Sequence, residues 1–387
     1  MTTKYLPGLE GVPATQSNIS YIDGERGILA YRGYPIEQLC QHSSFEEVAL
    51  LLLDGELPSA GELAEFDASL RQNRRMKYHL KEMMKHLPPA GHPMEMLQTA
   101  VASLGMFYPS GTACLSGGVC EDLNYIHRMT VKLIARMPVI VAWWQHMRRG
   151  YDPIDPRTDL SCAANLLYML DGEEPDPDLV RILDVCLILH AEHTINASTF
   201  AALVTGSTLA SPYSVVTAAI ATLSGPLHGG ANEQVLEMLE EIGRPEQAKP
   251  WLEARLANKQ KVWGFGHREY KVKDPRATIL QKLMEQLMAK RGGQVSPLFE
   301  VAVALEEAAN ERLAPKGVYP NVDYYSGLLY AEMGIPVDQF TSIFAVARSA
   351  GWLAHWREQL RDNRIFRPTQ VYTGEPIRDY TPITQRA

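Results

Sequence analysis

The chain has 387 residues, of which 46% are hydrophobic and 21% are charged, and its formal net charge at pH 7 is −8. This length exceeds the usual size of one hydrophobic core, so we expect a large domain and a smaller one. The negative charge argues against a general nucleic-acid or anionic-membrane partner. An anionic ligand would therefore need a local cluster of basic residues.

Cysteine usage and the N-terminus indicate the compartment. The five cysteines stand at positions 40, 114, 120, 162 and 186, an odd number without a Cys-x-x-Cys pair. This pattern predicts reduced, mostly buried thiols rather than a disulfide framework or a zinc site. The first ten residues have neither the apolar core of a signal peptide nor an Arg-rich transit pattern. We therefore expect a cytoplasmic protein.

The N-terminal part predicts one hairpin followed by helices. Residues 16–31 place β-forming residues on both sides of a glycine-rich turn, which is typical of a β-hairpin. Ser44 and Glu47 have the spacing of a helix-capping box ahead of an apolar run, and Ser59 and Glu62 repeat it. We expect a helix to follow each serine.

Helix signals continue through the rest of the chain. Asp176 and Pro177 supply an N-cap and a favoured first-turn proline for a helix that we expect to run towards residue 193. A glycine-rich stretch leads into another predicted helix, from about Ala231 to Glu241. No repeat of fixed period is apparent, which disfavours a solenoid. The sequence therefore predicts a mostly helical protein with a few short strands.

Two histidines interrupt an apolar stripe of the helix predicted after Asp176. His190 and His193 continue the spacing of Leu179, Leu183 and Cys186, which places both imidazoles towards the core. Buried imidazoles need hydrogen-bond partners, so two satisfied core histidines are one interpretation. A metal site is a second, although the string is not His-Glu-x-x-His and no third ligand is evident. A histidine at the floor of an active site is the third.

Three later segments each set one ionisable side chain among glycines or aromatic residues. They are Gly225–Glu233 with His228, Gly264–Arg276 with His267, and Pro320–Gly327 with Asp323. Small neighbours leave room for a ligand, and two imidazoles with a carboxylate suffice for proton transfer near neutral pH. The second segment and its approach also hold five basic residues, Lys261, Arg268, Lys271, Lys273 and Arg276. That stretch is either an exposed basic loop or an anion site.

Arg348 lies in a stretch that is apolar around most of a helical circumference, residues 340–353. A buried guanidinium keeps its proton and must face an anion. Either an internal carboxylate or a carboxylate-bearing ligand would serve, since the arginine fork matches carboxylate geometry.

Four strings together resemble the citrate synthase family, in its order and spacing, over residues 16–373. They are His-Ala-Glu-His-Thr-Ile-Asn-Ala-Ser-Thr (190–199), Gly-Pro-Leu-His-Gly-Gly-Ala-Asn-Glu (225–233), Gly-Phe-Gly-His-Arg-Glu-Tyr-Lys-Val-Lys-Asp-Pro-Arg (264–276) and Pro-Asn-Val-Asp-Tyr-Tyr-Ser-Gly (320–327). The N-terminal stretch from Ile19 to Tyr34 looks like the opening of the family's shorter form. Trp263 departs from the pattern, because many relatives carry a smaller residue there. It would pack against the CoA adenine or fill the domain interface.

The resemblance implies an all-α, multihelical, two-domain fold that forms a homodimer. Residues 1–230 and 333–387 would make the large domain, and residues 231–332 the small domain that closes over the substrates. The implied activity is that of an acyltransferase of the tricarboxylic acid cycle. It condenses acetyl-CoA with oxaloacetate and hydrolyses the thioester to citrate and CoA, with no cofactor and no metal. One alternative is 2-methylcitrate formation from propionyl-CoA. More remote ones are a non-catalytic helical scaffold and a metal-dependent hydrolase.

The resemblance also implies residue roles. Asp323 would take the methyl proton of acetyl-CoA, His228 would polarise the thioester carbonyl, and His267 would protonate the oxaloacetate ketone. The residues that would hold oxaloacetate are His193, Arg276, Arg348 and, from the partner subunit, Arg367. Lys271 and Lys316 would meet the CoA phosphates, and His190 would have a supporting role. Independently of the resemblance, the helix predicted after His228 should disfavour its protonated form.

Overall fold

The computed structural model describes residues 5–108, 123–292 and 296–386. In these ranges it has sixteen α-helices and one small antiparallel sheet of order β1–β2–β3, so the all-α prediction is confirmed. The strands are β1 (Ser20–Asp23), β2 (Ile28–Tyr31) and β3 (Tyr34–Pro35), and β1 with β2 forms the predicted hairpin. Of the cysteines, 40, 162 and 186 are free and buried as expected, while 114 and 120 lie outside the described residues.

The first half of the chain contributes α1 (Ile36–His42), α2 (Phe45–Asp54), α3 (Ala60–Asn73), α4 (Tyr78–Lys85), α5 (Pro93–Phe107), α6 (Leu123–Met147), α7 (Cys162–Asp171) and α8 (Pro177–Ala191). The second half contributes α9 (Ala197–Ser207), α10 (Pro212–Leu223), α11 (Ala231–Ile242), α12 (Ala248–Ala257), α13 (Pro275–Lys290), α14 (Pro297–Arg312), α15 (Val322–Glu332) and α16 (Phe340–Gln359).

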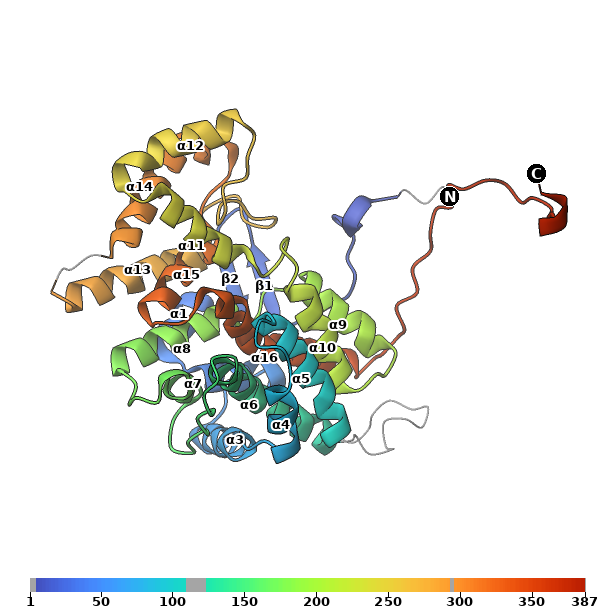
Figure 1. The fold of residues 1–387 in the computed structure, drawn as a ribbon, viewed down its shortest axis with the longest axis horizontal. Helices are drawn as coiled ribbons and strands as arrows, with labels where there is room; N and C mark the ends of the chain where they lie inside the picture. The colour runs from blue at the N-terminus through green and yellow to red at the C-terminus, as the bar shows by residue number, and fades with distance from the viewer. Residues whose placement is uncertain (1–4, 109–122, 293–295, 387) are drawn as a thin grey trace.

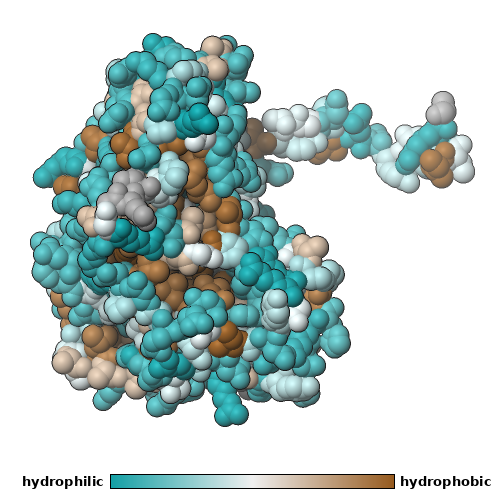
Figure 2. Space-filling model, turned by 60° about the vertical axis from the view of Figure 1, so that its left-hand side comes forward, coloured by the Kyte–Doolittle hydropathy of each residue, from teal (hydrophilic) through white to brown (hydrophobic). Residues whose placement is uncertain are grey.

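The helices fall into an upper and a lower group in Figure 1. Helices α11 to α15 lie together at the top and pack mainly on one another, whereas the other helices surround α16 below them. In Figure 2, hydrophobic residues gather in the hollow between the two parts of the molecule on the face turned forward. The upper group corresponds to the segment expected to form the small domain, 231–332, although the division into domains itself stays a prediction.

Helix α16 is the centre of the lower group. Every residue from Phe340 to Trp356 is buried, as expected for a helix that is apolar on all sides. It packs against α8, α6, α9 and α2, and it carries Arg348 into the interior. The prediction of a buried helix over 340–353 is confirmed.

The predicted helix starts are confirmed, and one predicted helix end is wrong. Ser59 and Glu62 form the complete capping box at α3, whereas Ser44 caps α2 alone because the Glu47 carboxylate binds the Ser43 hydroxyl. Asp176 caps α8, and α11 closely matches the helix predicted over 231–241.

Helix α8 stops at Ala191 instead of reaching residue 193, because Glu192 is extended. His193 therefore lies in a loop, where it is buried, and is not part of the apolar stripe of the helix that the spacing suggested.

The C-terminal segment leaves the body of the molecule. Beyond α16 the chain runs without regular structure apart from a short 3-10 turn, and Figure 1 shows it projecting away from the helices. Its exposed large apolar side chains are Ile365, Val371, Tyr372, Ile377, Tyr380 and Ile383. Within the described ranges, no helix is both long and apolar enough to cross a membrane.

The close passage of α16 over the end of α8 gives a stability prediction. A Cβ on Gly351 would lie 2.3 Å from Oε2 of Glu192 and 2.4 Å from the Ala191 carbonyl oxygen, so the two segments would have to separate. We expect Gly351→Ala to lower the free energy of unfolding by about 1–3 kcal/mol in urea denaturation.

Gly61→Ala is the matched control. Gly61 is exposed in α3 and an added Cβ meets no atom within 4 Å, so this variant should gain about 0.5–1 kcal/mol. A Gly351→Ala protein as stable as the wild type would contradict the tight contact between α8 and α16.

Candidate functional site

The segments 264–276 and 320–327 lie against each other. An isolated antiparallel bridge joins Phe265 to Pro320, and the Asn321 side chain then caps α15 by accepting the N–H of residue 323 at 3.0 Å. Two of the three motifs identified in the sequence therefore form one wall, which presents an imidazole and a carboxylate from neighbouring turns.

Glycine is required at two points of this wall. Gly264 and Gly266 have φ of +77° and +85°, a region that side chains with a Cβ rarely adopt. A Cβ on Gly264 would also lie 2.8 Å from side-chain atoms of Tyr324 and Val235. The Gly-x-Gly pattern thus reflects backbone geometry and close packing.

His267 is held in one neutral tautomer. Its Nδ1 accepts the backbone N–H of Glu269 at 3.0 Å, and that of Tyr270 at 3.4 Å. Since one ring nitrogen accepts, the proton of the neutral ring sits on Nε2, which can donate to a ligand. Burial, with a smaller contribution from Arg276, lowers the pKa of His267 to about 4. The ring is therefore an uncharged donor at neutral pH.

His193 faces the same space. Its ring centroid is 5.0 Å from that of His267, and its Nε2 is hydrogen-bonded to the Tyr270 hydroxyl at 3.2 Å. Burial, followed by the charge of Arg276, holds the pKa of His193 well below its usual value. Of the three interpretations given for His193, a histidine at the floor of an active site fits this arrangement, since its partner Tyr270 lies next to His267.

His228 is a second fixed donor. Its Nε2 accepts the backbone N–H of Ser198 at 3.3 Å and lies 2.9 Å from the Ser198 hydroxyl, which leaves the proton on Nδ1. Burial and then Arg348 lower the pKa of His228 to about 4. The sequence predicted this direction from the helix that follows, but the largest cause is desolvation.

Asp323 lies in the first turn of α15. Its Oδ1 is inaccessible to solvent and has no hydrogen-bond partner within the described part of the chain. Burial raises the pKa of Asp323 to about 6, against the opposing charges of Arg276 and Arg348. A poorly solvated carboxylate has a raised pKa and is therefore a stronger base than an exposed one.

Two guanidinium groups are buried beside this cluster. Arg276 is paired with Asp274 through Nε at 3.0 Å and Nη2 at 2.7 Å. Arg348 donates through Nε to the His190 carbonyl oxygen at 2.7 Å and lies over the Phe344 ring at 4.6 Å.

Among the described residues, no carboxylate forms an ion pair with Arg348, so a direct internal salt bridge does not account for it. Burial lowers the pKa of Arg348 to about 10, which still leaves it charged at neutral pH. Its remaining guanidinium N–H groups are suited to an anionic ligand.

Three predicted residues are not part of the cluster. Lys271 and Lys316 are exposed on adjacent turns, since a Cβ on Gly317 would lie 3.7 Å from the Lys271 carbonyl oxygen. Arg367 is exposed on the C-terminal segment, where its Nη1 donates to the Pro368 carbonyl oxygen. Among the described residues of this single chain, no contact brings Arg367 to the histidines.

Several partners of the site were missed by the sequence reasoning. Ser198 fixes His228, Trp352 donates to the Ser198 hydroxyl at 3.1 Å, and Tyr270 and Asp274 hold His193 and Arg276. Three of these stand inside the motif strings, which was the available signal. Trp352 lies in the stretch 340–353 that predicted a buried helix, but no local pattern links it to Ser198.

A cavity of ≈ 320 Å³ adjoins the loop that carries His228. It is lined by His92, Met94, Ser224, Pro226, Gly230, Glu233, Gln234, Trp263 and Thr341. Trp263 thus contributes to a cavity wall, and Nζ of Lys261 lies 3.7 Å from its ring centroid.

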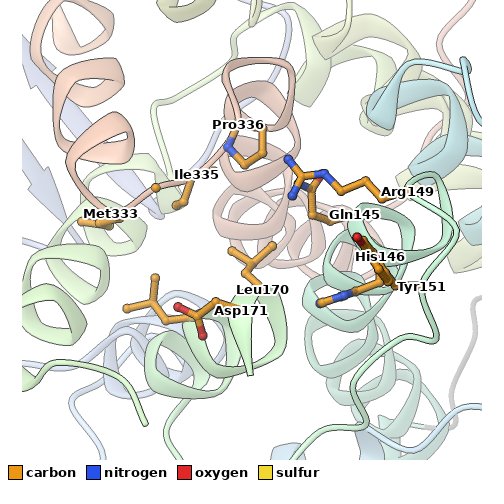
Figure 3. A pocket seen from close by; sticks show the side chains of 11 residues that line it. Gln145, His146, Arg149, Tyr151, Leu170, Asp171, Met333, Ile335 and Pro336 are labelled. Carbon is orange, nitrogen blue, oxygen red and sulfur yellow. The ribbon is translucent and has the colours of Figure 1, made fainter. Parts of the chain in front are cut away.

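A second cavity of ≈ 340 Å³ shares no residue with the histidine cluster. Figure 3 shows it between the ends of α6 and α7 and the turn after α15, with Arg149, Leu170 and Pro336 in its wall. Its lining holds none of the predicted catalytic side chains. Among the described residues there is also no group of three or more metal-ligating side chains.

Comparison with known proteins identifies the relatives. The family model "Citrate synthase, C-terminal domain" matches residues 8–369. Citrate synthase of Acidithiobacillus ferridurans is 61% identical over 99% of this chain and 98% of its own length, and that of Synechocystis sp. is 54% identical over 98% and 93%.

Solved structures that resemble this chain belong to the same family as these relatives. The crystal structure of citrate synthase from Pyrobaculum aerophilum has a TM-score of 0.91 at 43% identity, covering 98% of this chain and 95% of that one. A ternary complex of the Thermoplasma acidophilum enzyme with carboxymethyl coenzyme A and oxaloacetate has a TM-score of 0.90 at 32% identity, covering 98% of each.

The histidine pKa values give a prediction in solution. We expect the imidazole NMR signals of His228 and His267 to stay constant from about pH 8 to about pH 5.5, because both pKa values lie near 4. His92 is the internal control, since its ion-pair contact with Glu233, Nε2 to Oε2 at 3.8 Å, raises its pKa, so it should take up a proton at a higher pH than His228 and His267. Titration of His228 above pH 6 would contradict the buried, backbone-fixed ring.

Proposed function

The chain belongs to the citrate synthase family, and we propose that it condenses acetyl-CoA with oxaloacetate and then hydrolyses the thioester to citrate and CoA. The observation that carries the proposal is the pair of neutral imidazoles, His228 and His267. In each, a backbone N–H donates to one ring nitrogen and leaves the proton on the other. Relatives that carry the citrate synthase name, and one complex with a CoA derivative and oxaloacetate, support the choice of substrates.

Asp323 takes a proton from the methyl group of acetyl-CoA. The C–H electron pair becomes the C=C bond of an enolate, and the former carbonyl oxygen gains negative charge. A buried carboxylate with a pKa near 6 is suited to this step, since it is ionised at neutral pH and gains by accepting the proton.

His228 donates from Nδ1 to the thioester oxygen. A donor fixed in place before the reaction stabilises the developing oxyanion without a cost of reorganisation. The low pKa matters here, because the ring is neutral and Ser198 occupies its other nitrogen.

His267 completes carbon–carbon bond formation. The enolate carbon attacks the ketone carbon of oxaloacetate, and Nε2 of His267 gives its proton to the ketone oxygen. The two backbone N–H groups on Nδ1 stabilise the imidazolate that this leaves, and Nε2 is reprotonated through solvent as Asp323 releases the proton that it took. The product is citryl-CoA, and water then cleaves its thioester to release citrate and CoA. Asp323 and His267 enter from adjoining segments, which suits a reaction that needs both within one small space.

Oxaloacetate is a dianion, and the buried cations supply its binding site. Arg348 has no carboxylate in ion-pair contact among the described residues, while Arg276 is held by Asp274 with its fork oriented. His193 adds a neutral hydrogen-bonding group beside His267. Arg367 is proposed to reach the same ligand in the partner subunit, because in its own subunit it lies on an outlying segment.

The CoA portion is proposed to lie along the upper group of helices. The ≈ 320 Å³ cavity between Pro226, Gly230 and Trp263 receives the arm that leads to the thioester, next to the His228 loop. Lys271 and Lys316 are exposed on adjacent turns and carry the charge that CoA phosphates require. No cofactor takes part in this chemistry, since the thioester is itself a substrate.

A homodimer is supported by an almost uncharged surface. Helices α5, α9 and α10 pack side by side and contain one charged residue between them, Glu95. Their exposed positions include Thr99, Ala102, Met106, Val204, Ser214 and Ala221. Depletion of charge is typical of the centre of an interface between subunits. We propose that this face meets its copy and that the protein works in the cytoplasm.

Substituting the base tests the reaction. We expect the wild type to turn over acetyl-CoA with a higher kcat/KM than propionyl-CoA, since one methylene in the acyl pocket changes binding by about 1–3 kcal/mol. Asp323→Asn should lower kcat by about 10²–10⁴ with either thioester, because the amide cannot accept the methyl proton. Release of free CoA thiol measures both.

Thermal unfolding of Asp323→Asn should match the wild type, which separates lost chemistry from lost structure. Wild-type turnover in this variant would favour a different base. A preference for propionyl-CoA would favour the 2-methylcitrate reaction instead.

Mixed dimers test whether Arg367 acts across the interface. We expect Asp323→Asn and Arg367→Gln proteins to be nearly inactive alone, and activity to return when they are unfolded and refolded together. One site of each mixed dimer then has an intact Asp323 from one subunit and an intact Arg367 from the other. If Arg367 served its own subunit, neither site would be complete and mixing would restore nothing.

A further inference from the structure

One face of α15 carries a row of buried polar side chains behind the proposed base. Asp323, Ser326 and Tyr330 stand at helical spacings of three and four, so each lies next to the following one on the same face. Ser326 and Tyr330 are completely buried. Oδ1 of Asp323, Oγ of Ser326 and the Tyr330 hydroxyl have no hydrogen-bond partner within the described part of the chain.

His190 lies at the far end of this face. Its ring centroid is 6.3 Å from that of Tyr330, and its Nδ1 is 2.7 Å from the Cys186 carbonyl oxygen. A carbonyl oxygen only accepts, so Nδ1 carries the proton and Nε2 is left as an acceptor. That Nε2 is buried and, like the three oxygens, has no partner among the described residues.

We propose that Asp323, Ser326, Tyr330 and His190 form one hydrogen-bonded row, closed through bridging water, that positions the base and favours its protonated form. We call these four residues the α15 row. The inference rests on the proposed function, in which Asp323 removes the methyl proton, and it assigns Ser326, Tyr330 and His190 as positioning residues. The row explains why polar groups that would each be costly to bury alone are buried together.

The order of donors and acceptors along the row follows from His190. Because Nε2 can only accept, the neighbouring hydroxyl donates towards it, and Tyr330 therefore turns its lone pairs towards Ser326. Ser326 in turn donates towards Tyr330 and presents a lone pair towards Asp323. The row thus presents an acceptor, the Ser326 oxygen, to Asp323. This acceptor binds the protonated form of Asp323 better than the ionised form.

The tautomer and the hydroxyl are both fixed by burial. Burial lowers the pKa of His190 to about 3, so its Nε2 stays unprotonated at neutral pH. Burial also keeps the pKa of Tyr330 well above its usual value, so Tyr330 stays a hydroxyl and can donate. Neither His190 nor Tyr330 can reverse its role near neutral pH.

The row counteracts the charges around the base. Arg276 and Arg348 face Asp323 from α13 and α16, and Lys261 faces it from the loop before Gly264; all three favour the carboxylate. Asp274 favours the acid. With several cations near, an acceptor at the end of the row helps to keep Asp323 basic enough to take a carbon-bound proton.

Removing one hydroxyl tests the row. In Tyr330→Phe we expect kcat to fall about five- to tenfold, the value of one hydrogen bond. The acid limb of kcat/KM for acetyl-CoA should move to lower pH, because the acid form of Asp323 loses its support. KM for oxaloacetate should be unchanged, since within the described part of the chain the Tyr330 hydroxyl makes no hydrogen bond with Arg276, Arg348 or His193.

Tyr324→Phe is the matched control. Tyr324 is also completely buried on α15, but its hydroxyl donates to the Ala302 carbonyl oxygen at 2.7 Å and takes no part in the row. This variant should keep the wild-type acid limb. Ser326→Ala should move the limb in the same direction as Tyr330→Phe. The double variant should be no worse than the stronger single one, because either change breaks the same row.

An unchanged acid limb in both Tyr330→Phe and Ser326→Ala would overturn the row, and so would an equal shift in Tyr324→Phe. Additive losses in the double variant would also count against it. These outcomes are separate from a failure of the proposed function, which would appear as wild-type turnover in Asp323→Asn.

Discussion

Two buried guanidinium groups determine the electrostatics of this protein. Arg276 and Arg348 are both out of solvent, and Arg276 alone has a carboxylate in contact among the described residues. Their positive charge adds to burial in keeping the neighbouring histidines neutral and opposes burial at Asp323. A protein interior accepts such charge at a cost in stability unless an anion is supplied. The proposed dianionic substrate supplies this anion, so the same two buried charges serve both substrate binding and catalysis.

Hydrogen bonds from the backbone fix the ring nitrogens of three histidines. His228 and His267 are each fixed by backbone donors on one nitrogen, which leaves the other nitrogen as the donor to substrate. His190 is fixed in the opposite sense by a backbone carbonyl, which leaves it an acceptor. Local chain geometry therefore assigns three imidazoles two different roles, and the α15 row extends that assignment to the base.

Much of the fold and site could be predicted, for identifiable reasons. The α3 capping box, the hairpin and the buried helix around Arg348 depend on neighbouring residues, so local pattern was enough. The end of α8 was misplaced because Glu192 leaves the helix to bind Ser20 and His355, both distant in sequence. Trp352 was missed for the same reason, since its contact with Ser198 spans two helices.

The sequence by itself determined which groups are proposed to react and what their immediate settings are, because the glycines and caps that shape each motif are local. It also determined the helical character and, through four coincident strings, the family. Only the tertiary structure decided the protonation of those groups. Desolvation depends on what other helices cover, and the tautomers of His190 and His228 depend on which backbone atoms meet their nitrogens. Tertiary packing likewise decided that Arg348 has no carboxylate in ion-pair contact among the described residues.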